Sequence, residues 1–541
     1  MTDRTPSDRA DVCVVGAGPA GALAAHRLAA AGHQVVVLEA GPRFDPQDRL
    51  DRMEDAIRPV QSDPEVWDMG GDRDAFSASG DRYYPLNVSR VKGVGGSTLH
   101  WQGMVMRLHE ADFDGTFGDP WPIDYADLRP YYAEAESKLG VAGASDNPFA
   151  PPREAPFPMS AFPPSYSDSL FADACESLGV SMHSVPNARN SEAFDGRSPC
   201  QGYGTCSPVC PSGAKYDATV DIKEAEAEGA RVIDRVPVQR LLTDDAGERI
   251  EAAVYADPEG REHRQEAREF VLAAGGVEIP RLLLLSASRQ HPEGLANRSG
   301  AVGRYFSDHL FAGAGGTIPE RTRQNHVGFI TSECHQFYDD PGQAVGLGAD
   351  PTISSTDSGL APIKLEFLNY AGPSPVELAL SGDGWGDEML RDLRAAYGNS
   401  IAMGGLVGQE PRAENRVALD HSTTDDHGNP VPDIQWSLDA RTERTLERAN
   451  RIQHAIHEEL GTSVSWTVGP ANTGPAYHHM CTTRMGSDPT ESVVNARLRT
   501  HDHPNLSIAS SSVFRTPGSM NPTLTIASLS LKAADHVAAR L

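Results

Sequence analysis

The chain has 541 residues, too many for one ordinary hydrophobic core, so two domains or one domain with large insertions are expected. Its 75 acidic and 47 basic residues give a formal net charge of -28, which argues against binding to a nucleic-acid backbone. The sequence contains no run of about twenty apolar residues, the length that a membrane-spanning helix needs, so no transmembrane segment is expected.

The acidic excess comes with an unusually low proportion of lysine, because only six of the 47 basic residues are lysine and the others are arginine. Such a surface repels itself in dilute buffer, but at about 1 M salt the Debye length falls to about 3 Å and the repulsion is screened. We therefore predict a halophilic protein, made for a salty cytoplasm or brine. An ordinary acidic protein from a GC-rich genome, with arginine favoured by codon usage, is the alternative.

The first sixteen residues, MTDRTPSDRADVCVVG, contain neither the apolar stretch of a secretory signal nor a twin-arginine signal. Two locations are consistent with this. Either the protein stays in the cytoplasm or another molecule carries it out.

A strand–helix–strand unit is expected over residues 12–41. A buried strand over 12–15 precedes the loop GAGPAG, a helix follows through AGALAAHRLAAAG and ends at Gly32, and QVVVLEAG forms a second strand that closes on Glu39. Glycines in the G-x-G-x-x-G pattern let the backbone approach a pyrophosphate at the helix N-terminus, and Glu39 can accept from ribose hydroxyls. These glycines are Gly16, Gly18 and Gly21. The unit predicts a dinucleotide site without distinguishing NAD from FAD.

Two further segments distinguish the two cofactors. KGVGGSTLHWQG, residues 92–103, is a second glycine loop, and FVLAAGGVEIPRLLLLSA, residues 270–287, is a buried strand followed by a helix expected to open near Pro280. Together with the C-terminal blocks within 477–535, which begin YHHMCTTRMG and include SMNPTLTI, these segments resemble the glucose–methanol–choline (GMC) oxidoreductase family. The resemblance covers both ends of the chain and several internal blocks.

The resemblance implies an α/β fold, with a Rossmann-like FAD-binding domain and a discontinuous, sheet-based α+β substrate domain. It assigns residues 1–155, 200–310 and 477–541 to the FAD domain and 311–476 to the substrate domain, where specificity would lie. Seven prolines between Pro148 and Pro164 exclude a helix or central strand there, so residues 156–199 are expected to be a Pro-rich excursion leading to the cysteine loop 200–215. The expected cofactor contacts are Gly16, Gly18, Gly21, Glu39, Gly95, Gly96, Ser97, His100 and Ala274.

The family moves a hydride from an alcohol carbon to the flavin, so the hydroxyl proton needs a base. The family's base lies in a Tyr-His pair followed four residues on by Thr, which selects His478, with His479 as the adjacent competitor. Histidine suits this role because much of it is neutral near pH 7. The family usually has Gly before that Thr, whereas this chain has Cys481, which we assign to packing and expect to narrow the pocket.

The second polar group of the family's catalytic pair is His or Asn before Pro, which matches Asn521. Its amide can donate to the substrate oxygen without titrating, although an Asn-Pro pair is also an ordinary turn former. His100 stands where some relatives carry a histidine attached to the flavin 8α-methyl group. A covalent bond and a ring packed on the flavin are both compatible with that position.

Three of the seven cysteines lie in the loop CQGYGTCSPVCPSGAK with C-x5-C-x3-C spacing. The loop resembles the cluster segment of the FAD-dependent glucose dehydrogenase and gluconate 2-dehydrogenase flavoprotein branch, which implies that Cys200, Cys206 and Cys210 hold a three-iron, four-sulfur (3Fe-4S) cluster. Pro199 stands where close relatives have a second cysteine, so a four-iron cluster would need a distant fourth ligand. Zinc with an outside ligand, a disulfide plus one thiol, and three inert cysteines are the alternatives.

A cluster favours a dehydrogenase, because an oxidase returns electrons to oxygen at the flavin itself. We therefore expect an FAD-dependent dehydrogenase that oxidises an alcohol group of a sugar, sugar acid or polyol and delivers electrons through the cluster to an external haem or quinone acceptor. Relatives in this branch work with a small subunit that bears the export signal, which would place the protein outside the cytoplasm. An oxygen-using oxidase of the same fold and a non-catalytic flavoprotein interaction module are the alternatives.

Overall fold

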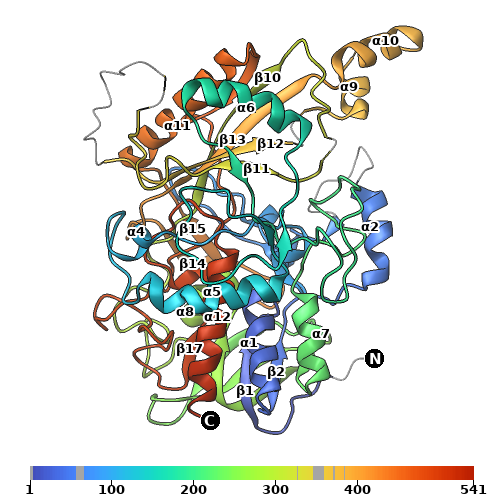
Figure 1. Cartoon of the computed structure of the whole chain (residues 1–541). Coiled ribbons are helices and arrows are strands. Elements are labelled where there is room, and N and C mark those ends of the chain that lie inside the picture. Colours follow the sequence, from blue (N-terminus) through green and yellow to red (C-terminus); the bar gives the residue numbers. More distant parts are fainter. Residues whose placement is uncertain are drawn as a thin grey trace.

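The computed structural model describes residues 4–56, 66–325, 327–344, 346, 359–369, 372–382 and 384–541. Two sheets organise these residues. Figure 1 shows β1 and β2 near both chain ends, and the sheet that contains β10, β12 and β13 at the opposite end of the molecule, beneath helices α6 and α11. Within the described part of the chain, no helix combines the length and the apolar character needed to cross a bilayer.

The first sheet has seven strands, and its parallel part binds the two chain ends together. In spatial order the strands are β6 (Arg231–Ile233), β2 (Val35–Leu38), β1 (Ala10–Val15), β9 (Glu262–Leu272), β8 (Ile250–Ala256) and β7 (Val238–Thr243), with β17 (Leu506–Ile508) also paired to β9. Strands β1, β2, β6, β9 and β17 run parallel, while β8 is antiparallel to both neighbours. Their valine-rich runs are buried because helices cover a parallel sheet on its faces.

The predicted strand–helix–strand unit is confirmed as β1, α1 (Pro19–Ala30) and β2. Helix α1 packs between α12 (Thr523–Ala538) and α7 (Thr219–Ala227). The chain leaves α1 through Gly32 at φ +87°, a conformation that favours glycine. A Cβ on Gly21 would lie 1.9 Å from the Gly16 carbonyl oxygen, so only glycine lets this helix approach the strand so closely.

The helix after β9 begins earlier than the sequence pattern predicts. Helix α8 (Gly275–Leu285) opens at Gly275, and Pro280 lies inside it rather than at its start. Because proline has no N–H, Pro280 leaves the Gly276 carbonyl without its helical donor. The Thr482 hydroxyl supplies that hydrogen bond at 2.6 Å, so the proline is tolerated through a contact from the other end of the chain.

The second sheet is wholly antiparallel. In spatial order its strands are β16 (Ser463–Val468), β10 (His309–Thr317), β13 (Ser400–Gly408), β12 (Ile363–Leu368), β11 (Ser332–Cys334) and β5 (His183–Ser184). Helices α11 (Ala440–Glu459) and α6 (Tyr166–Leu178) cover one of its faces, where Leu310, Ala312 and Ala314 are buried (Figure 1). The other face carries His309 and Phe311.

The predicted division into domains remains a prediction, and the structure adds detail to it. Residues 156–199, expected as a Pro-rich excursion, include α6 and β5, and both join the second sheet. The remaining elements are α2 (Arg49–Ala56), α4 (Glu110–Phe113), α5 (Tyr125–Leu139), β3 (Ala142–Gly143), β4 (Met159–Ser160), α9 (Pro375–Ser381), α10 (Asp387–Ala396), and the hairpin β14 (Arg416–Thr424) and β15 (Pro430–Gln435). The hairpin packs on α8.

Candidate active site

A cavity of about 1070 Å³ runs from the end of β1 to the second sheet. Seven of the nine expected cofactor contacts and both expected catalytic residues line it: Gly16, Gly18, Glu39, Gly96, Ser97, His100, Ala274, His478 and Asn521. Gly21 and Gly95 do not line the cavity, and each instead supports the structure of the chain around it. Gly21 permits the close helix approach, and the Gly95 N–H donates to Ala17 at 2.9 Å.

The first glycine loop leaves room for a ligand. A Cβ on Gly18 would meet nothing closer than the Gly96 Cα at 3.9 Å, so the space in front of this helix N-terminus is open. Open space at such an end, with its unpaired N–H groups, fits the pyrophosphate of a dinucleotide. The residues present are therefore compatible with FAD.

Glu39 is buried at the end of β2 and organises this loop. Its carboxylate accepts hydrogen bonds from the Ala17 N–H at 2.8 Å and the Gly41 N–H at 2.9 Å. Burial raises the pKa of Glu39, while the backbone N–H groups oppose that rise. Since each carboxylate oxygen has two lone pairs, Glu39 keeps acceptor capacity for ribose hydroxyls.

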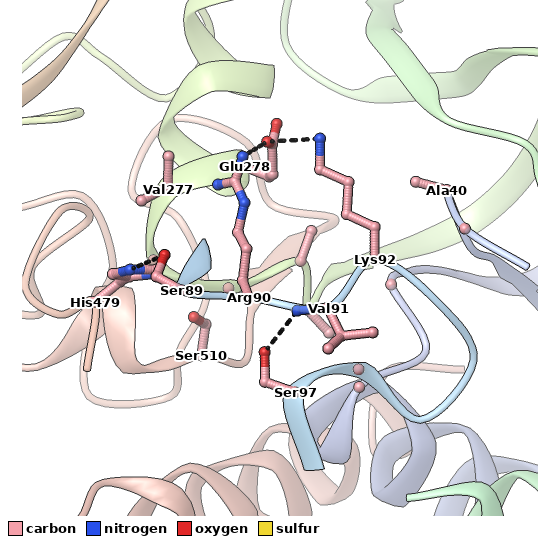
Figure 2. Close-up of a pocket in the computed structure, with 18 of the residues that line it drawn as sticks. Ala40, Ser89, Arg90, Val91, Lys92, Ser97, Val277, Glu278, His479 and Ser510 are labelled. Atoms are coloured by element: carbon pink, nitrogen blue, oxygen red, sulfur yellow. Dashed lines mark hydrogen bonds and ion pairs between the residues drawn. The ribbon is translucent and has the colours of Figure 1, made fainter. Parts of the chain in front are cut away.

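A network of charged residues clamps the second glycine loop to α8. Figure 2 shows Arg90 and Lys92 converging on Glu278, at 2.6 Å and 3.4 Å, and the Val91 N–H donating to Ser97. Burial alone would raise the pKa of Glu278, but the cations around it lower it far below its usual range. The clamp fixes the wall of the cavity that carries Gly96 and Ser97.

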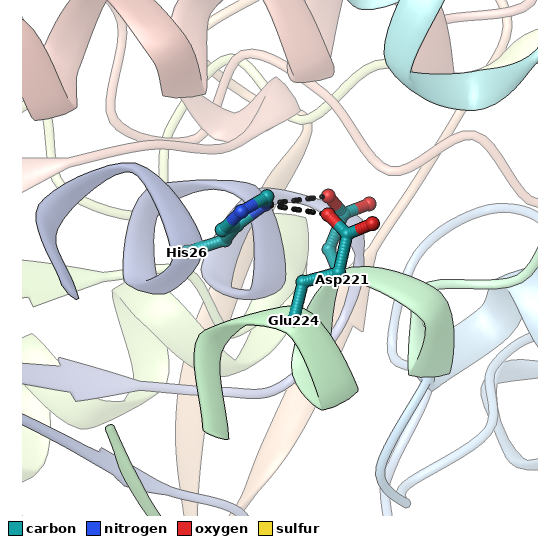
Figure 3. A group of neighbouring side chains, drawn as sticks. All are labelled: His26, Asp221 and Glu224. Carbon is teal, nitrogen blue, oxygen red and sulfur yellow. Dashed lines mark hydrogen bonds and ion pairs between the residues drawn. The ribbon is translucent and has the colours of Figure 1, made fainter. Parts of the chain in front are cut away.

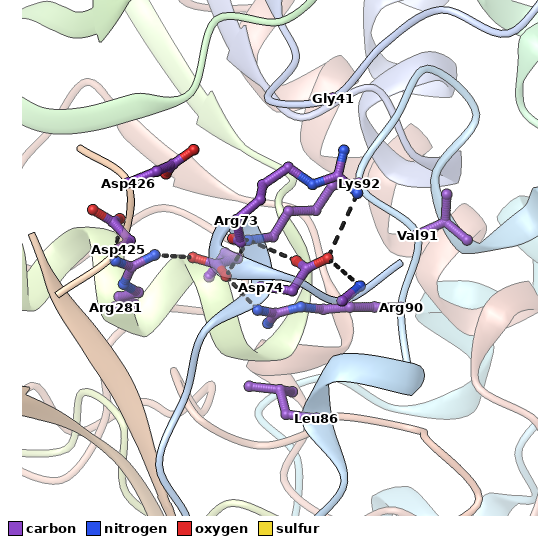
Figure 4. A network of polar contacts seen from close by, with 12 residues as sticks. Gly41, Arg73, Asp74, Leu86, Arg90, Val91, Lys92, Arg281, Asp425 and Asp426 are labelled. Carbon is purple, nitrogen blue, oxygen red and sulfur yellow. Dashed lines mark hydrogen bonds and ion pairs between the residues drawn. The ribbon is translucent and has the colours of Figure 1, made fainter. Parts of the chain in front are cut away.

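The same network reaches the β14–β15 hairpin, which the sequence did not link to the site. Arg281 donates to Asp425 at 2.6 Å, and Lys92 lies 3.0 Å from Asp74, as Figure 4 shows. Asp425, Asp426 and His427 at the hairpin tip all line the cavity. Charge pairing between α8 and the hairpin therefore closes one side of the site.

His478 lies at the far end of the cavity and contacts a second histidine, His309. Their Nδ1 atoms are 2.9 Å apart, and the other ring nitrogen of His309, Nε2, lies 2.9 Å from the Pro517 carbonyl oxygen. Since a carbonyl only accepts, Nε2 of neutral His309 carries the proton and its Nδ1 accepts from His478 Nδ1–H. This arrangement leaves Nε2 of His478 unprotonated and available as a base.

Burial and nearby positive charge keep both imidazoles neutral. Burial lowers the pKa of His309 to about 4. Burial also holds the pKa of His478 well below its usual value, and the neighbouring His309 and Lys364 add to that effect. The backbone of His478 is fixed by Asp308, which accepts its N–H at 2.8 Å and also accepts the Tyr84 hydroxyl. Neither His309 nor Asp308 belongs to a sequence motif that we could interpret.

His479 occupies a different environment. Its Nε2 lies 3.2 Å from the Ser89 hydroxyl, which itself donates to the Leu86 carbonyl. Its ring packs 5.7 Å from that of Tyr84, and burial lowers its pKa to about 3. Because the proton of the Ser89 hydroxyl is already used, His479 Nε2 is the donor in this contact. Since Nε2 is unprotonated in His478 and protonated in His479, His478 is favoured as the base.

Asn521 is held by a buried charged cluster on the second sheet. The Lys364 ammonium donates to Asn521 Oδ1 at 2.7 Å and pairs with Glu333 at 2.9 Å and Glu366 at 2.7 Å. Since Oδ1 accepts from lysine, the two N–H groups of the amide remain available as donors. In the strand sequence IKLEFL, two opposite charges at alternate positions among apolar residues would have revealed this cluster.

The cysteine loop packs directly beside the segment that contains His100. The Ser207 hydroxyl donates to the His100 carbonyl at 3.2 Å, and Ser207 itself lines the cavity. Lys215 Nζ donates to the Trp101 carbonyl at 2.5 Å and to that of Cys206 at 2.7 Å. The cysteine loop is therefore a direct neighbour of the cavity.

The three cysteines are free thiols, with Cys206 and Cys210 buried and Cys200 half-buried. Arg189 donates to Cys206 Sγ at 2.6 Å, and the Lys215 N–H donates to Cys210 Sγ at 3.4 Å. Burial opposes ionisation of Cys210, but the Lys215 N–H and the charges of Lys215 and Arg189 lower its pKa. The three sulfurs do not all lie within 4.8 Å of one another, the spacing expected around a single ion such as zinc.

One group in the described residues does meet that spacing, and it lies elsewhere. His26 of α1 lies 3.2 Å from Asp221 and 3.0 Å from Glu224, both on α7 (Figure 3). The Tyr216 hydroxyl also donates to Asp221 at 2.5 Å. None of these side chains lines the cavity. The contacts tie two packed helices together.

Burial and the charge of Lys215 lower the pKa of His100 to about 4, so its ring is neutral at the cavity wall. Cys481 is fully buried at φ +71°, a backbone region that favours glycine, and burial raises its pKa to about 12. An inert, buried thiol at this position agrees with a packing role.

Comparisons with known proteins match this architecture. A GMC oxidoreductase model matches residues 84–311, its C-terminal counterpart matches 411–530, and a model of FAD dependent oxidoreductases matches 11–47. A structure of formate oxidase superposes with a TM-score of 0.69 at 16% identity and covers 99% of both chains.

Three curated relatives align along nearly their whole length. The chain is 34% identical to the fructose dehydrogenase large subunit of Gluconobacter japonicus over 99% of both chains. It is 28% identical to paromamine 6'-oxidase of Streptomyces fradiae, covering 100% of this chain and 93% of the relative. It is 25% identical to the gluconate 2-dehydrogenase flavoprotein of Pantoea cypripedii, covering 96% and 92%.

Proposed function

Because the chain belongs to the GMC oxidoreductase family, and is an FAD-dependent oxidoreductase of alcohol groups, we propose that it dehydrogenates a sugar, sugar acid or polyol. An iron–sulfur cluster held by Cys200, Cys206 and Cys210 would supply the one-electron carrier between the flavin and an external haem or quinone acceptor. Two of its relatives are named for the sugar fructose and the sugar acid gluconate, which supports this substrate class.

The residues at the far end of the cavity supply the proton chemistry. Nε2 of His478 takes the proton of the substrate hydroxyl, while His309 holds the imidazole in the tautomer that leaves Nε2 free. The amide N–H groups of Asn521 donate to the substrate oxygen, which becomes more negative as its proton leaves. Bound FAD supplies the hydride acceptor when these groups have oriented the alcohol.

The observation that carries the cluster proposal is a pair of buried cations. Arg189 and Lys215 are almost fully buried, and in the described part of the chain their side chains donate to a sulfur, an amide oxygen and backbone carbonyls, not to a carboxylate. They lie instead against Cys206 and Cys210. Burying an unpaired cation is costly, and burial accordingly lowers the pKa of Lys215 to about 8. Iron-bound thiolates would supply the missing negative charge, and the cluster would supply a one-electron carrier.

The same proposal includes a partner. One relative is named as a large subunit, and another as the flavoprotein of its enzyme, which supports assembly with further subunits. A small subunit with an export signal would carry this chain out of the cytoplasm. Outside the cytoplasm, a haem protein or a quinone would accept the electrons.

The test replaces one cysteine and follows the two half-reactions separately. Cys206→Ser should leave anaerobic reduction of FAD by substrate largely intact, because His478 and Asn521 are untouched. Transfer to the natural acceptor should fail, and the paramagnetic signal of an oxidised three-iron centre should disappear. Cys175→Ser is the matched control, since Cys175 is a buried thiol of α6 far in sequence from the loop.

Each of the following outcomes would contradict part of this proposal. Zinc or no metal in the purified protein, or full transfer by Cys206→Ser, would remove the cluster. Stoichiometric hydrogen peroxide in air would favour the oxidase, an alternative that the paromamine 6'-oxidase relative keeps open. A flavin that no alcohol reduces without oxygen would favour a non-catalytic module.

A further inference from the structure

The face of the second sheet opposite α11 continues the cavity wall, and we call it the inner face. On β10, alternation places His309, Phe311, Gly313 and Gly315 on this face. Strand register adds Leu406, Gly404 and Ala402 from β13, Lys364 and Glu366 from β12, and Trp466 from β16. Phe311, Leu406 and Glu366 line the same cavity as His478 and Asn521. The inner face therefore extends outward from the catalytic end.

Two aromatic rings cover the glycines of the inner face. A Cβ on Gly315 would lie 2.5 Å from the Trp466 ring, and one on Gly404 would lie 2.6 Å from the Phe311 ring. Both rings also approach the position that a Gly313 side chain would take, at 3.2 Å and 2.7 Å. The glycines thus form a floor on which Phe311 and Trp466 lie as neighbours. We call these two rings the aromatic platform.

The platform is exposed on its outer end. Trp466 keeps 39% of its surface accessible although its ring lies over Gly315. Tryptophan at a sheet edge is normally covered, because its apolar area is large. An aromatic surface that is supported on one side and open on the other is suited to stacking against a ligand.

A polar group stands next to the platform. Glu366 is buried on the inner face opposite Gly404, and its Oε1 pairs with Lys364 Nζ at 2.7 Å but has no second partner among the described residues. A buried carboxylate oxygen in a cavity wall has unused acceptor capacity. Hydroxyl groups of a ligand would satisfy it.

We propose that the inner face is a carbohydrate subsite, in which the C–H face of a sugar ring stacks on Phe311 and Trp466 while ring hydroxyls donate to Glu366. This inference rests on the proposed function and narrows it. A sugar ring has one flat apolar face and an edge of hydroxyls, which match the two parts of the subsite. An acyclic polyol lacks the flat face.

The charge of the subsite also separates sugars from sugar acids. The buried cluster contains one lysine and two carboxylates, Glu333 and Glu366, so it has no spare positive charge for a substrate carboxylate. A second anion beside Glu366 would be repelled in this buried setting. Neutral ring sugars are therefore preferred over aldonic acids.

The test compares anaerobic flavin reduction by fructose, glucose, sorbitol, glycerol and gluconate in the holoenzyme and its variants. For ring sugars, Trp466→Ala should raise the half-saturating concentration at least about tenfold, equivalent to about 1.4 kcal/mol, with the maximal rate changed less. For sorbitol and glycerol the half-saturating concentration should stay the same. Trp466→Tyr should restore ring-sugar binding, and Glu366→Gln should weaken it. Trp385→Ala, at a residue just before α10 that is 86% exposed, is the matched control.

A second measurement does not depend on turnover. Ring sugars should quench part of the tryptophan fluorescence of the wild-type holoenzyme, and Trp466→Phe should abolish that change. If wild-type flavin is reduced by none of the sugars, polyols or acids, the proposed function fails. If sugars reduce it but Trp466→Ala behaves as wild type, or loses sorbitol and fructose equally, only the subsite is refuted.

Discussion

The Lys364 ammonium donates a hydrogen bond to the Asn521 side-chain oxygen at 2.7 Å, although the two residues are 157 positions apart in sequence. The contact determines which way the amide points. With its oxygen bound to lysine, Asn521 can only donate toward the cavity, which is the polarity that an alcohol oxygen losing its proton requires. Glu333 and Glu366 in turn hold Lys364 in place.

Asn521→Asp should test the donor role alone, because aspartate has nearly the size and shape of asparagine but no side-chain N–H. The new carboxylate would pair with Lys364 but would have no N–H to offer, and it would place negative charge beside the substrate oxygen. Flavin reduction should slow by about 10²-fold to 10³-fold, the scale for losing one such donor, while FAD stays bound. Asn521→His, which keeps a donor, should lose much less. Equal losses in the two variants would contradict the donor role.

His478→Ala should reduce the rate of anaerobic flavin reduction by about 10²-fold or more, because a positioned base is lost. The flavin content should be unchanged. His479→Ala serves as the control, since His479 Nε2 donates to the Ser89 hydroxyl and has no free lone pair to accept a proton. A larger loss in His479→Ala would reverse the assignment of the base.

The pH dependence of flavin reduction follows from the depressed pKa of His478. Burial, with the neighbouring His309 and the charge of Lys364, holds this pKa well below the ordinary value of about 6.5. The active form is the neutral imidazole, so lowering its pKa extends activity to more acidic pH. The rate should stay near its maximum through pH 6.5 and decline only below it. Stopped-flow measurement of the flavin-reduction rate at different pH values tests this. A rate that already falls at or above pH 6.5 as the pH is lowered would contradict the prediction.

Gly21→Ala should damage the cofactor site although Gly21 itself does not line the cavity. The added methyl group would meet the Gly16 carbonyl oxygen at 1.9 Å, so α1 must move away from the first glycine loop. We expect a destabilisation of about 1–3 kcal/mol and substoichiometric FAD, measured by thermal melting and by released flavin. Gly474→Ala is the control, because a Cβ there meets nothing within 4 Å. Full FAD content and an unchanged melting temperature in Gly21→Ala would argue against the tight packing.

The acidic excess predicts salt-dependent stability. A net charge of -28 repels itself most strongly in dilute buffer, so screening should raise the melting temperature between low salt and molar KCl. Calorimetry at matched pH measures this directly. A melting temperature that is flat, or that falls with added KCl, would exclude the halophilic interpretation.

The amino-acid sequence was sufficient for the parts of this protein in which function follows from local chain geometry. Gly16, Gly18 and Gly21 lie within six residues, and the strand and helix around them depend on short-range contacts. The expected dinucleotide site could therefore be located from the sequence alone. His478 and Asn521 were found through contiguous motifs that resemble a family. The start of α8 was predicted wrongly, because a hydroxyl from Thr482 compensates for Pro280, and no local pattern encodes that contact.

Only the tertiary structure brought together the groups that orient those residues. His309, Lys364, Glu366 and Trp466 come from three strands, β10, β12 and β16, and antiparallel pairing puts them on one face of one sheet. Such pairing depends on register between strands that are far apart in sequence, and a shift of one residue would move every side chain to the opposite face. The tautomer of His478, the orientation of Asn521 and the aromatic platform are therefore properties of the folded protein, because each depends on contacts with strands that are distant in sequence.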